Sequence, residues 1–274
     1  MSAPTELEPF QPSQGFKATA SPNPNWTYGE GIESTPEGRA WMEGEKEGWK
    51  VVDTSDPSQK RAVYNIMKSG IVPRPIAFVS SVSEDGIENL APFSWFNQVS
   101  KDPPLISIAC SHLEGGSAKD TARNIKSGTG FTVNVISESW IDQANVCSTP
   151  VPFELSEWPI SGLTKAPSIK AKAPRVKESA FVLECDLFQA IDIRHPTTNE
   201  VVTTLILGHV NYIHMRNDVI EPVRGIVDIG KLKPIARVGG ITYAKVSEGF
   251  SLPSKQWKDI EEGVRVKLGD ISSK

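Results

Sequence analysis

Short apolar runs divided by turn residues follow one another after about residue 51, and this pattern most constrains the fold. Three such runs are Pro75–Val82, Ile87–Val99 and Leu105–Cys110. A Glu-Asp-Gly sequence between the first two predicts a tight hairpin turn, and Asp102–Pro104 predicts the end of the second. We expect the second strand to bend at Pro92, because proline has no N–H to give to a neighbouring strand.

The later runs extend the same β-rich pattern. Phe131–Ile136 alternates with a period of two, and the longer runs Ala180–Ile193 and Val201–Met215 flank a polar loop, Arg194–Glu200. Thr242–Val246 is a last short strand. Because the strands come as hairpins and do not alternate singly with helices, the sequence favours a mainly β fold. We expect an antiparallel barrel with a few peripheral helices, not a doubly wound sheet.

Two segments of the β-rich region carry helix signals. Ser117–Gly128 offers Ser117 as an N-cap, with Asp120 three residues later and a glycine at the end. Ser137–Cys147 is the second predicted helix, with Ser137 as its cap. We predict helices at both places and an irregular, proline-punctuated backbone over 148–178.

The first fifty residues differ from the rest of the chain. Proline and glycine are dense there and interrupt both helices and ladders. This stretch nevertheless contains Trp26, Tyr28, Trp41 and Trp49. We therefore expect residues 1–50 to form an extended arm, clamped onto the main domain or a partner subunit, with one short helix over 35–48. Residues 51–250 form the expected domain, and 251–274 an expected helical tail.

Composition excludes several classes of protein. The chain is 38% hydrophobic and 23% charged, as expected of a globular protein, and its net charge of −4 argues against nucleic-acid binding and against docking on anionic lipid. Since no window approaches 18 apolar residues, we expect no membrane span. The three cysteines are far apart and the amino-terminal sequence lacks a secretory pattern, so we expect a cytoplasmic protein.

The common motifs of several enzyme classes are absent from the sequence. It contains no GxGxxG, no GxxxxGK[ST] and no GxSxG, and its four histidines show neither HExxH nor HxH spacing. We therefore expect no metal site and no common nucleotide loop. Nothing local indicates a hydrolase triad, although the residues of a triad can come together from distant parts of a sequence.

Five sequence pieces, in order, carry the most specific signal. They are VPRPIAFVS at 72–80, NLAPFSWF at 89–96, DPPL at 102–105, KDTARNI at 119–125 and LKPIARVGGITYAKV at 232–246. Together they resemble the flavin reductase-like, FMN-binding split-barrel family, which includes flavoredoxins. The resemblance covers about residues 60–250. It implies a Greek-key-like antiparallel split β-barrel, FMN as cofactor and a homodimer with the flavin near the dimer interface.

Candidate cofactor-binding residues follow from these motifs and from the chemistry of their side chains. They are Arg74, Ser80, Ser81, Val82, Ala91, Pro92, Ser94, Phe96, Ser111, Lys119, Asp120, Thr121 and Asn124. A helix beginning near residue 117 would offer free N–H groups to a phosphate, and Lys119 and Thr121 add a cation and a hydroxyl. The alternative is a solvated basic helix face.

The remaining candidates also have ordinary structural interpretations. Arg74 lies between two prolines, which hold its backbone extended, and its guanidinium suits a phosphate or simply a stiff surface loop. Ser80 and Ser81 would contact the ribityl chain or the flavin edge, or else cap the hairpin turn. Small Ala91 and Ser94 permit close approach of a ring, whereas Phe96 serves equally well as core.

The resemblance implies an oxidoreductase in which NADH or NADPH passes hydride to the flavin N5, with FAD as an exchangeable substrate. Two alternatives stay open: an electron carrier with tightly bound FMN, and a non-catalytic FMN-binding protein. The sequence does not indicate whether NADH or NADPH is preferred, or which molecule accepts the electrons.

Overall fold

The computed structural model describes residues 7–113 and 115–269 and separates into two compact units. The barrel unit comprises Met1–Phe16 and Asn65–Ser247. The terminal unit comprises Lys17–Tyr64 and Glu248–Lys274. The described residues contain no helix that is long and apolar enough to cross a membrane.

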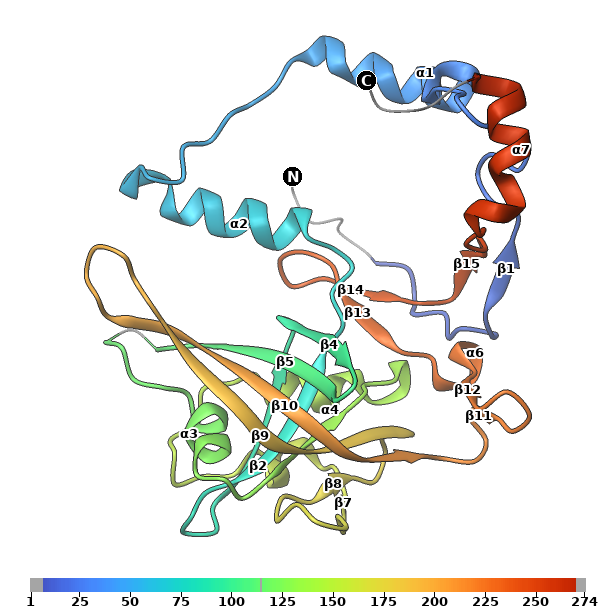
Figure 1. The fold of residues 1–274 in the computed structure, drawn as a ribbon. Coiled ribbons are helices and arrows are strands. Elements are labelled where there is room, and N and C mark those ends of the chain that lie inside the picture. Colours follow the sequence, from blue (N-terminus) through green and yellow to red (C-terminus); the bar gives the residue numbers. More distant parts are fainter. Residues whose placement is uncertain (1–6, 114, 270–274) are drawn as a thin grey trace. The chain divides into compact units, whose positions relative to one another are not determined.

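A seven-stranded antiparallel sheet forms the centre of the barrel unit (Figure 1). The strand order is β3-β2-β6-β9-β10-β5-β4, and the sheet does not close, so β3 and β4 are its edges. The strands are β2 (Ala77–Val82), β3 (Glu88–Phe93), β4 (Phe96–Lys101), β5 (Pro104–Ser111), β6 (Phe131–Asn134), β9 (Phe181–Arg194) and β10 (Val201–Met215). The prediction of a mainly β, antiparallel fold with a few helices is confirmed.

The predicted second strand is divided in the structure. Ile87–Val99 was expected as one strand bent at Pro92, but β3 ends at Phe93 and β4 begins at Phe96. The two strands lie on opposite edges of the sheet, because β3 pairs with β2 while β4 pairs with β5. Pro92 lies inside β3, on an edge strand where no second neighbour needs its N–H.

Two clusters of buried side chains pack on the two faces of the sheet. Alternation along β2 divides them: Ala77 and Val79 belong to one cluster, and Phe78 belongs to the other. The first cluster includes Phe131 and the helix α3 (Asp120–Lys126), through Ala122 and Ile125. The second includes Trp140 from the 3-10 helix η4 (Glu138–Trp140) and Trp158 from α5 (Glu157–Ser161).

The helices of the barrel unit are short, and one begins later than predicted. They are α3, the 3-10 helix η4 (Glu138–Trp140), α4 (Ile141–Val146), α5 (Glu157–Ser161) and α6 (Ile229–Leu232). The prediction that Ser117 caps α3 is wrong: Lys119 occupies the N-cap position, with no side-chain hydrogen bond. Ser117 instead belongs to a turn, because its carbonyl accepts from Leu113 N at 2.9 Å and Gly116 has φ of 81°.

Three two-stranded ladders and the amino-terminal segment complete the barrel unit. The ladders pair β7 (Lys165–Ala166) with β8 (Arg175–Val176), β11 (Ile220–Glu221) with β12 (Ile226–Val227), and β13 (Ile235–Arg237) with β14 (Tyr243–Lys245). Ser13 donates from its N and Oγ to the two carboxylate oxygens of Glu138, at 2.9 and 2.8 Å. Lys245 donates to Gln11 O at 2.6 Å.

The terminal unit joins the two ends of the chain by a parallel pair of strands. These are β1 (Lys17–Thr19) and β15 (Glu248–Phe250), labelled with α1 and α7 in Figure 1. Its other elements are η1 (Ile32–Ser34), α1 (Pro36–Met42), η2 (Glu43–Glu47), η3 (Pro57–Gln59) and α7 (Trp257–Leu268), and α2 (Lys60–Gly70) runs from this unit into the other.

Candidate functional site

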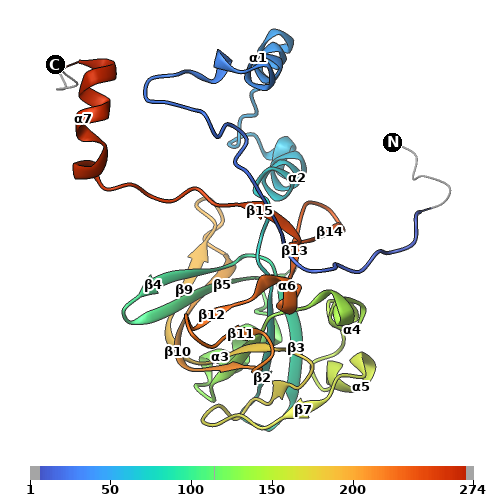
Figure 2. The same cartoon turned by 90° about the vertical axis from the view of Figure 1, so that its right-hand side faces the viewer.

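A pocket of about 350 Å³ opens at the edge strand β3 of the barrel unit. Helices α4 and α5 lie beside β3 (Figure 2), and the start of α3 supplies another wall. The residues that line the pocket come from β3, from the segment after β5, from the start of α3, from the segment after α4 and from α5. They are Asn89, Ala91, Pro92, Phe93, Leu113, Lys119, Asp120, Thr121, Cys147, Ser148, Thr149, Pro150, Val151 and Glu157.

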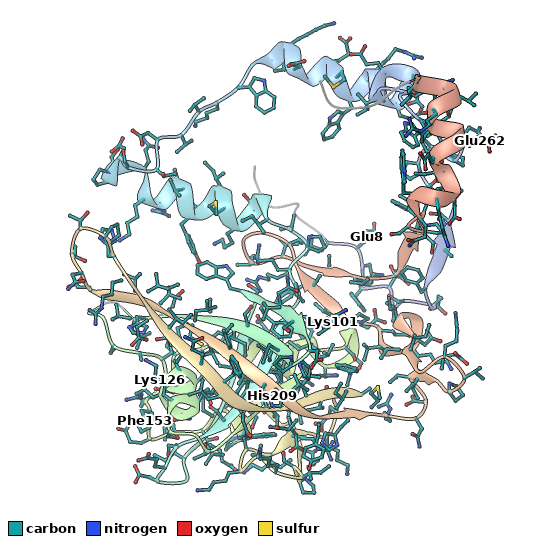
Figure 3. All side chains as sticks on the ribbon, in the orientation of Figure 1. Glu8, Lys101, Lys126, Phe153, His209 and Glu262 are labelled. Carbon is teal, nitrogen blue, oxygen red and sulfur yellow. The ribbon has the colours of Figure 1, made fainter. Side chains whose placement is uncertain are left out.

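The start of α3 gives the pocket a positive group and free backbone donors. The N–H groups of a first helical turn have no intrahelical acceptor, and Lys119 is the N-cap residue of this helix. Arg123, one turn later, is already engaged: it forms an ion pair with Asp120, and its guanidinium lies 3.9 Å from the ring centroid of Phe153. Phe153 and Lys126 mark the neighbourhood of α3 in Figure 3. Lys119 is thus the lysine that faces the pocket.

A chain of hydrogen bonds runs from Thr121 to a buried carboxylate. Thr121 Oγ1 donates to Asn89 Oδ1 at 2.7 Å, and Asn89 Nδ2 lies 3.0 Å from each carboxylate oxygen of Glu157. Leu90 N donates to Glu157 Oε2 at 2.8 Å. Glu157 is only 4% exposed. By accepting from Leu90 N, it gives a partner to a backbone N–H on the side of β3 that has no neighbouring strand.

Two further candidates, Asn124 of α3 and Ser81 of β2, join this network. Asn124 Nδ2 donates to Ser81 Oγ at 3.1 Å, and Ser81 Oγ lies 3.5 Å from Asn89 Oδ1. Ser80 points to the opposite face of β2, because successive residues of a strand alternate. Its Oγ is fully buried and has no hydrogen-bond partner among the described residues. The adjacent serines therefore do not share one site.

Burial changes the acidity of two groups in the pocket wall. Burial raises the pKa of Glu157, against the lowering effect of the bonds from Leu90 and Asn89. Burial also raises the pKa of the Cys147 thiol to about 12. A thiol with that pKa stays protonated at neutral pH and is a poor nucleophile.

The other predicted residues lie away from the pocket lining. Arg74 donates Nη1 to the carbonyls of Lys68 and Ile71, the latter at 2.7 Å, and its Nε lies 3.4 Å from Ser94 Oγ. The guanidinium is thus largely used inside the chain. Three further candidates lie within strands of the sheet. The carbonyl of Val82 accepts a hydrogen bond from Thr129 Oγ1. Phe96 lies opposite Ile108, and Ser111 lies opposite Thr203, on the neighbouring strands.

The structure thus brings together only some of the thirteen predicted residues. Ala91, Pro92, Lys119, Asp120 and Thr121 line the pocket, whereas Ser81 and Asn124 support it. Sequence reasoning missed Asn89 and Glu157. Asn89 begins one of the quoted motifs, so its position was available. Glu157 comes from the irregular, proline-rich segment, where no local pattern marks it.

The family comparison covers most of the barrel unit. A model of the flavin reductase like domain matches residues 67–228. An uncharacterised protein of Halalkalibacterium halodurans is 36% identical over 72% of this chain and 93% of its own length. The uncharacterised protein YwrF of Bacillus subtilis is 34% identical over 72% of this chain and 96% of its own length.

Solved structures agree with this assignment. Nitrilotriacetate monooxygenase component B from Bacillus cereus is 33% identical, with a TM-score of 0.68 over 74% of this chain and 100% of that chain. The 2-nitrobenzoate 2-nitroreductase of Pseudomonas fluorescens is 27% identical, with a TM-score of 0.65 over 76% of this chain and 98% of that chain. The matched segment contains β2 to β10, the pocket and its hydrogen-bond network, and the chain belongs to the flavin reductase-like domain family.

Proposed function

We propose that this protein is an FMN-dependent oxidoreductase that takes hydride from NADH or NADPH and holds the flavin at the β3–α3 pocket. The observation that carries the proposal is the composition of that pocket. It combines Lys119 and the donors of the α3 start with small and apolar walls at Ala91 and Pro92, inside the family-matched segment. Membership of the family supports a flavin-related oxidoreductase activity.

The residues present fit FMN in a particular orientation. A phosphate is favoured near the Lys119 ammonium and the first-turn N–H groups of α3. The carboxylates of Asp120 and Glu157 also line the pocket and repel a dianion. We therefore expect the phosphate on the Lys119 side and the uncharged parts of the flavin towards Pro92 and Leu113.

The flavin, when bound, supplies the hydride-accepting chemistry. The chain's own residues bind and orient it. Lys119 holds the phosphate, the absence of an N–H at Pro92 leaves an apolar edge for a ring, and Leu113 and Val151 exclude water. No acid–base pair of the protein is needed for hydride transfer to a flavin.

The test is oxidation of the nicotinamide followed by its absorbance at 340 nm. Purified protein is mixed with NADH or NADPH in the presence of FMN, FAD or riboflavin. The proposal predicts catalytic oxidation of at least one nicotinamide with FMN. Oxidation with release of free reduced flavin indicates a reductase, and reduction of retained flavin without release indicates an electron carrier. Binding of FMN without any nicotinamide oxidation would contradict the proposed activity.

We further propose that the protein is a cytoplasmic homodimer. Apolar side chains beside the loop that joins β9 to β10 support this proposal, because Ile191, Ile193 and Val202 are each 40–43% exposed. Large apolar groups gathered on one hairpin are typical of surfaces that contact another chain. Analytical ultracentrifugation tests the proposal: a dimer is expected, and a monomer at micromolar concentration would contradict it.

A further inference from the structure

A relay of hydrogen bonds joins the segment before α3 to the β9–β10 hairpin. His112, which follows β5, has its Nδ1 2.9 Å from Gly116 O and its Nε2 2.9 Å from Thr204 Oγ1. Thr204 Oγ1 lies 2.7 Å from Asp192 Oδ1, and Lys126 Nζ lies 2.7 Å from the same oxygen. The relay therefore connects the end of β5 with β10, β9 and α3.

The protons of the relay are fixed from its Asp192 end. Hydrogen bonds from Lys126 and Thr204 lower the pKa of Asp192, so at neutral pH this residue is a carboxylate, which only accepts. Thr204 is fully buried, and at 2.7 Å its hydroxyl must place its single proton towards Asp192. The Thr204 oxygen therefore has only lone pairs left for His112.

His112 consequently faces an acceptor at each ring nitrogen. The carbonyl of Gly116 has no proton to give, and the proton of the Thr204 hydroxyl is already used. A neutral imidazole has one N–H, so it would leave one of the two 2.9 Å contacts without a proton. Only the imidazolium form, which has an N–H at each nitrogen, makes both hydrogen bonds.

The charged groups near His112 do not by themselves decide its protonation. Among the described residues, the relay brings Asp192 of β9 and Lys126 of α3 towards the ring, and these two form an ion pair with each other. On β5, burial raises the pKa of the Cys110 thiol to about 12, against the lowering effect of the Lys119 charge, so this thiol is neutral. The two acceptors that contact the ring therefore hold its second proton.

The position of His112 gives this proton a consequence for the pocket. Backbone bonds close the segment after His112, because Leu113 N donates to Ser117 O at 2.9 Å and Gly116 N donates to Leu113 O at 3.0 Å. Leu113 lines the pocket, and so does Lys119, the N-cap residue of α3. The His112 ring braces this segment at Gly116 and ties it to β10.

We propose that His112 is a positioning residue for the pocket: as an imidazolium it fixes the segment that carries Leu113 and Lys119 against β10, and the segment loosens when the ring loses its second proton. The proposal rests on the pocket being the flavin site. Flavin affinity should then fall as the pH rises, because a neutral ring must release either Gly116 O or Thr204.

The first test reads the protonation of His112 in the full chain without flavin. Long-range proton–nitrogen NMR spectra distinguish an imidazolium from a neutral ring, which has one bare nitrogen, and His112→Gln identifies the signal. We expect an imidazolium at pH 7 in the wild-type protein. Thr204→Val removes the acceptor at Nε2 and should give a neutral ring, whereas Thr204→Ser keeps a hydroxyl and should restore the imidazolium.

Asp192→Asn is a second variant, at a side chain that is 40% exposed. The asparagine amide can donate to Thr204, which frees the hydroxyl proton for His112, so the ring needs only one proton of its own. We expect a neutral ring here also. Circular dichroism establishes that each variant is folded.

The second test follows FMN affinity by fluorescence titration between about pH 6.5 and about pH 8.5. Wild-type affinity should fall at least three-fold over this range, and Thr204→Ser should follow it. Thr204→Val and Asp192→Asn should show much flatter profiles. His195→Gln is the matched control, because His195 lies in the exposed β9–β10 loop, where its Nδ1 accepts from Thr197 N and Thr198 N. Its profile should follow that of the wild type.

Two results would overturn the inference. One is a neutral His112 in the wild-type protein at pH 7. The other is an FMN affinity whose pH profile is the same in the wild type, in Thr204→Val and in Asp192→Asn. Failure of the wild-type protein to bind FMN at any pH is a different result, because it overturns the proposed function, and the NMR signal of His112 distinguishes the two failures.

Discussion

The barrel unit and the terminal unit contain the same kinds of local signal but bury very different amounts of apolar surface. In the terminal unit Thr35 caps α1 by accepting a hydrogen bond from Gly38 N at 3.0 Å, and Asp56 caps η3 by accepting one from Ser58 N at 2.8 Å. Yet Val264 is the only apolar side chain of this unit that is buried among the described residues. In the barrel unit Phe78 and Phe131 are fully buried.

The difference shows that local signals and tertiary packing are separate sources of structure. Caps and prolines are enough to define short helices, but most helix stability in proteins comes from burying an apolar face. The aromatic residues of the amino-terminal arm illustrate the point. Trp26, Trp41 and Trp49 are 52%, 77% and 85% exposed, so they contribute little to a core in this chain. We expect substitutions to be costly in the barrel unit and mild in the terminal unit.

The largest expected effect is that of Phe131→Ala in the barrel core. Phe131 is fully buried, and replacing it should leave a cavity and lower the free energy of unfolding by about 3–5 kcal/mol. Urea denaturation followed by tryptophan fluorescence measures the change. Phe188→Ala is the matched control, because Phe188 is 55% exposed on β9 and should change stability by less than about 0.5 kcal/mol. Equal effects of the two substitutions would remove the basis of the comparison.

Lys119→Ala tests the part of the barrel unit that we assign to the phosphate. Loss of a charged contact should weaken FMN binding by about 1.5–3 kcal/mol, or roughly 10- to 150-fold. Riboflavin binding should change much less. Lys126→Ala serves as control, since Lys126 lies at the other end of α3 and pairs with Asp192 at 2.7 Å. An FMN affinity that survives Lys119→Ala unchanged would exclude this phosphate position.

The carboxylate of Glu184, in the barrel unit, should make the free energy of unfolding depend on pH. Burial raises its pKa, but bonds from Lys170 N, Ile169 N and His214 lower it by more, so the pKa of the folded protein lies below the usual value. The stability that Glu184 contributes is therefore present above about pH 4.3, its unfolded pKa, and is lost as the pH falls through the lower folded value.

Glu184→Gln should lower the free energy of unfolding at pH 7 by about 2 kcal/mol and flatten its decline as the pH falls below about 4.3. Urea denaturation across this range is the measurement. In the terminal unit, Asp56→Asn changes a partly exposed carboxylate whose pKa is lowered by hydrogen bonds from Ser58. Because these bonds join residues only two apart in the chain, the substitution should change the acid profile of global unfolding far less than Glu184→Gln does. A wild-type profile in Glu184→Gln would contradict the expectation.

The smallest effect is expected from Val264→Ala in α7. Removing two buried methyl-sized groups should cost about 1.5 kcal/mol, confined to the terminal unit. Amide hydrogen exchange should show roughly ten-fold faster exchange in α7, with no change in β9. Faster exchange in both elements would mean that the two units unfold as one.

Prediction from the sequence succeeded where a pattern is local and periodic. Val201–Met215 was predicted as a strand and is β10, and the Glu-Asp-Gly turn is the β2–β3 hairpin. The prediction was wrong where neighbouring residues compete for one role. Ser117 has the chemistry of a cap, but the preceding glycines draw it into a turn, and α3 begins after Lys119.

The candidate site was only partly accessible to such reasoning. Lys119, Thr121, Ala91 and Pro92 lie in short motifs and line the pocket. Glu157 lies far from them in the sequence and reaches Leu90 only because α5 packs on the edge of the sheet. No periodicity over residues 148–178 specifies that packing.

The most direct test of the central claim is the visible spectrum of the purified protein during titration with FMN, together with mass spectrometry of any cofactor released on denaturation. We predict either a yellow protein that releases FMN, or a colourless protein that shifts the absorbance spectrum of added FMN until binding is saturated. A protein that releases no flavin and leaves the FMN spectrum unchanged at saturating concentration would contradict the claim.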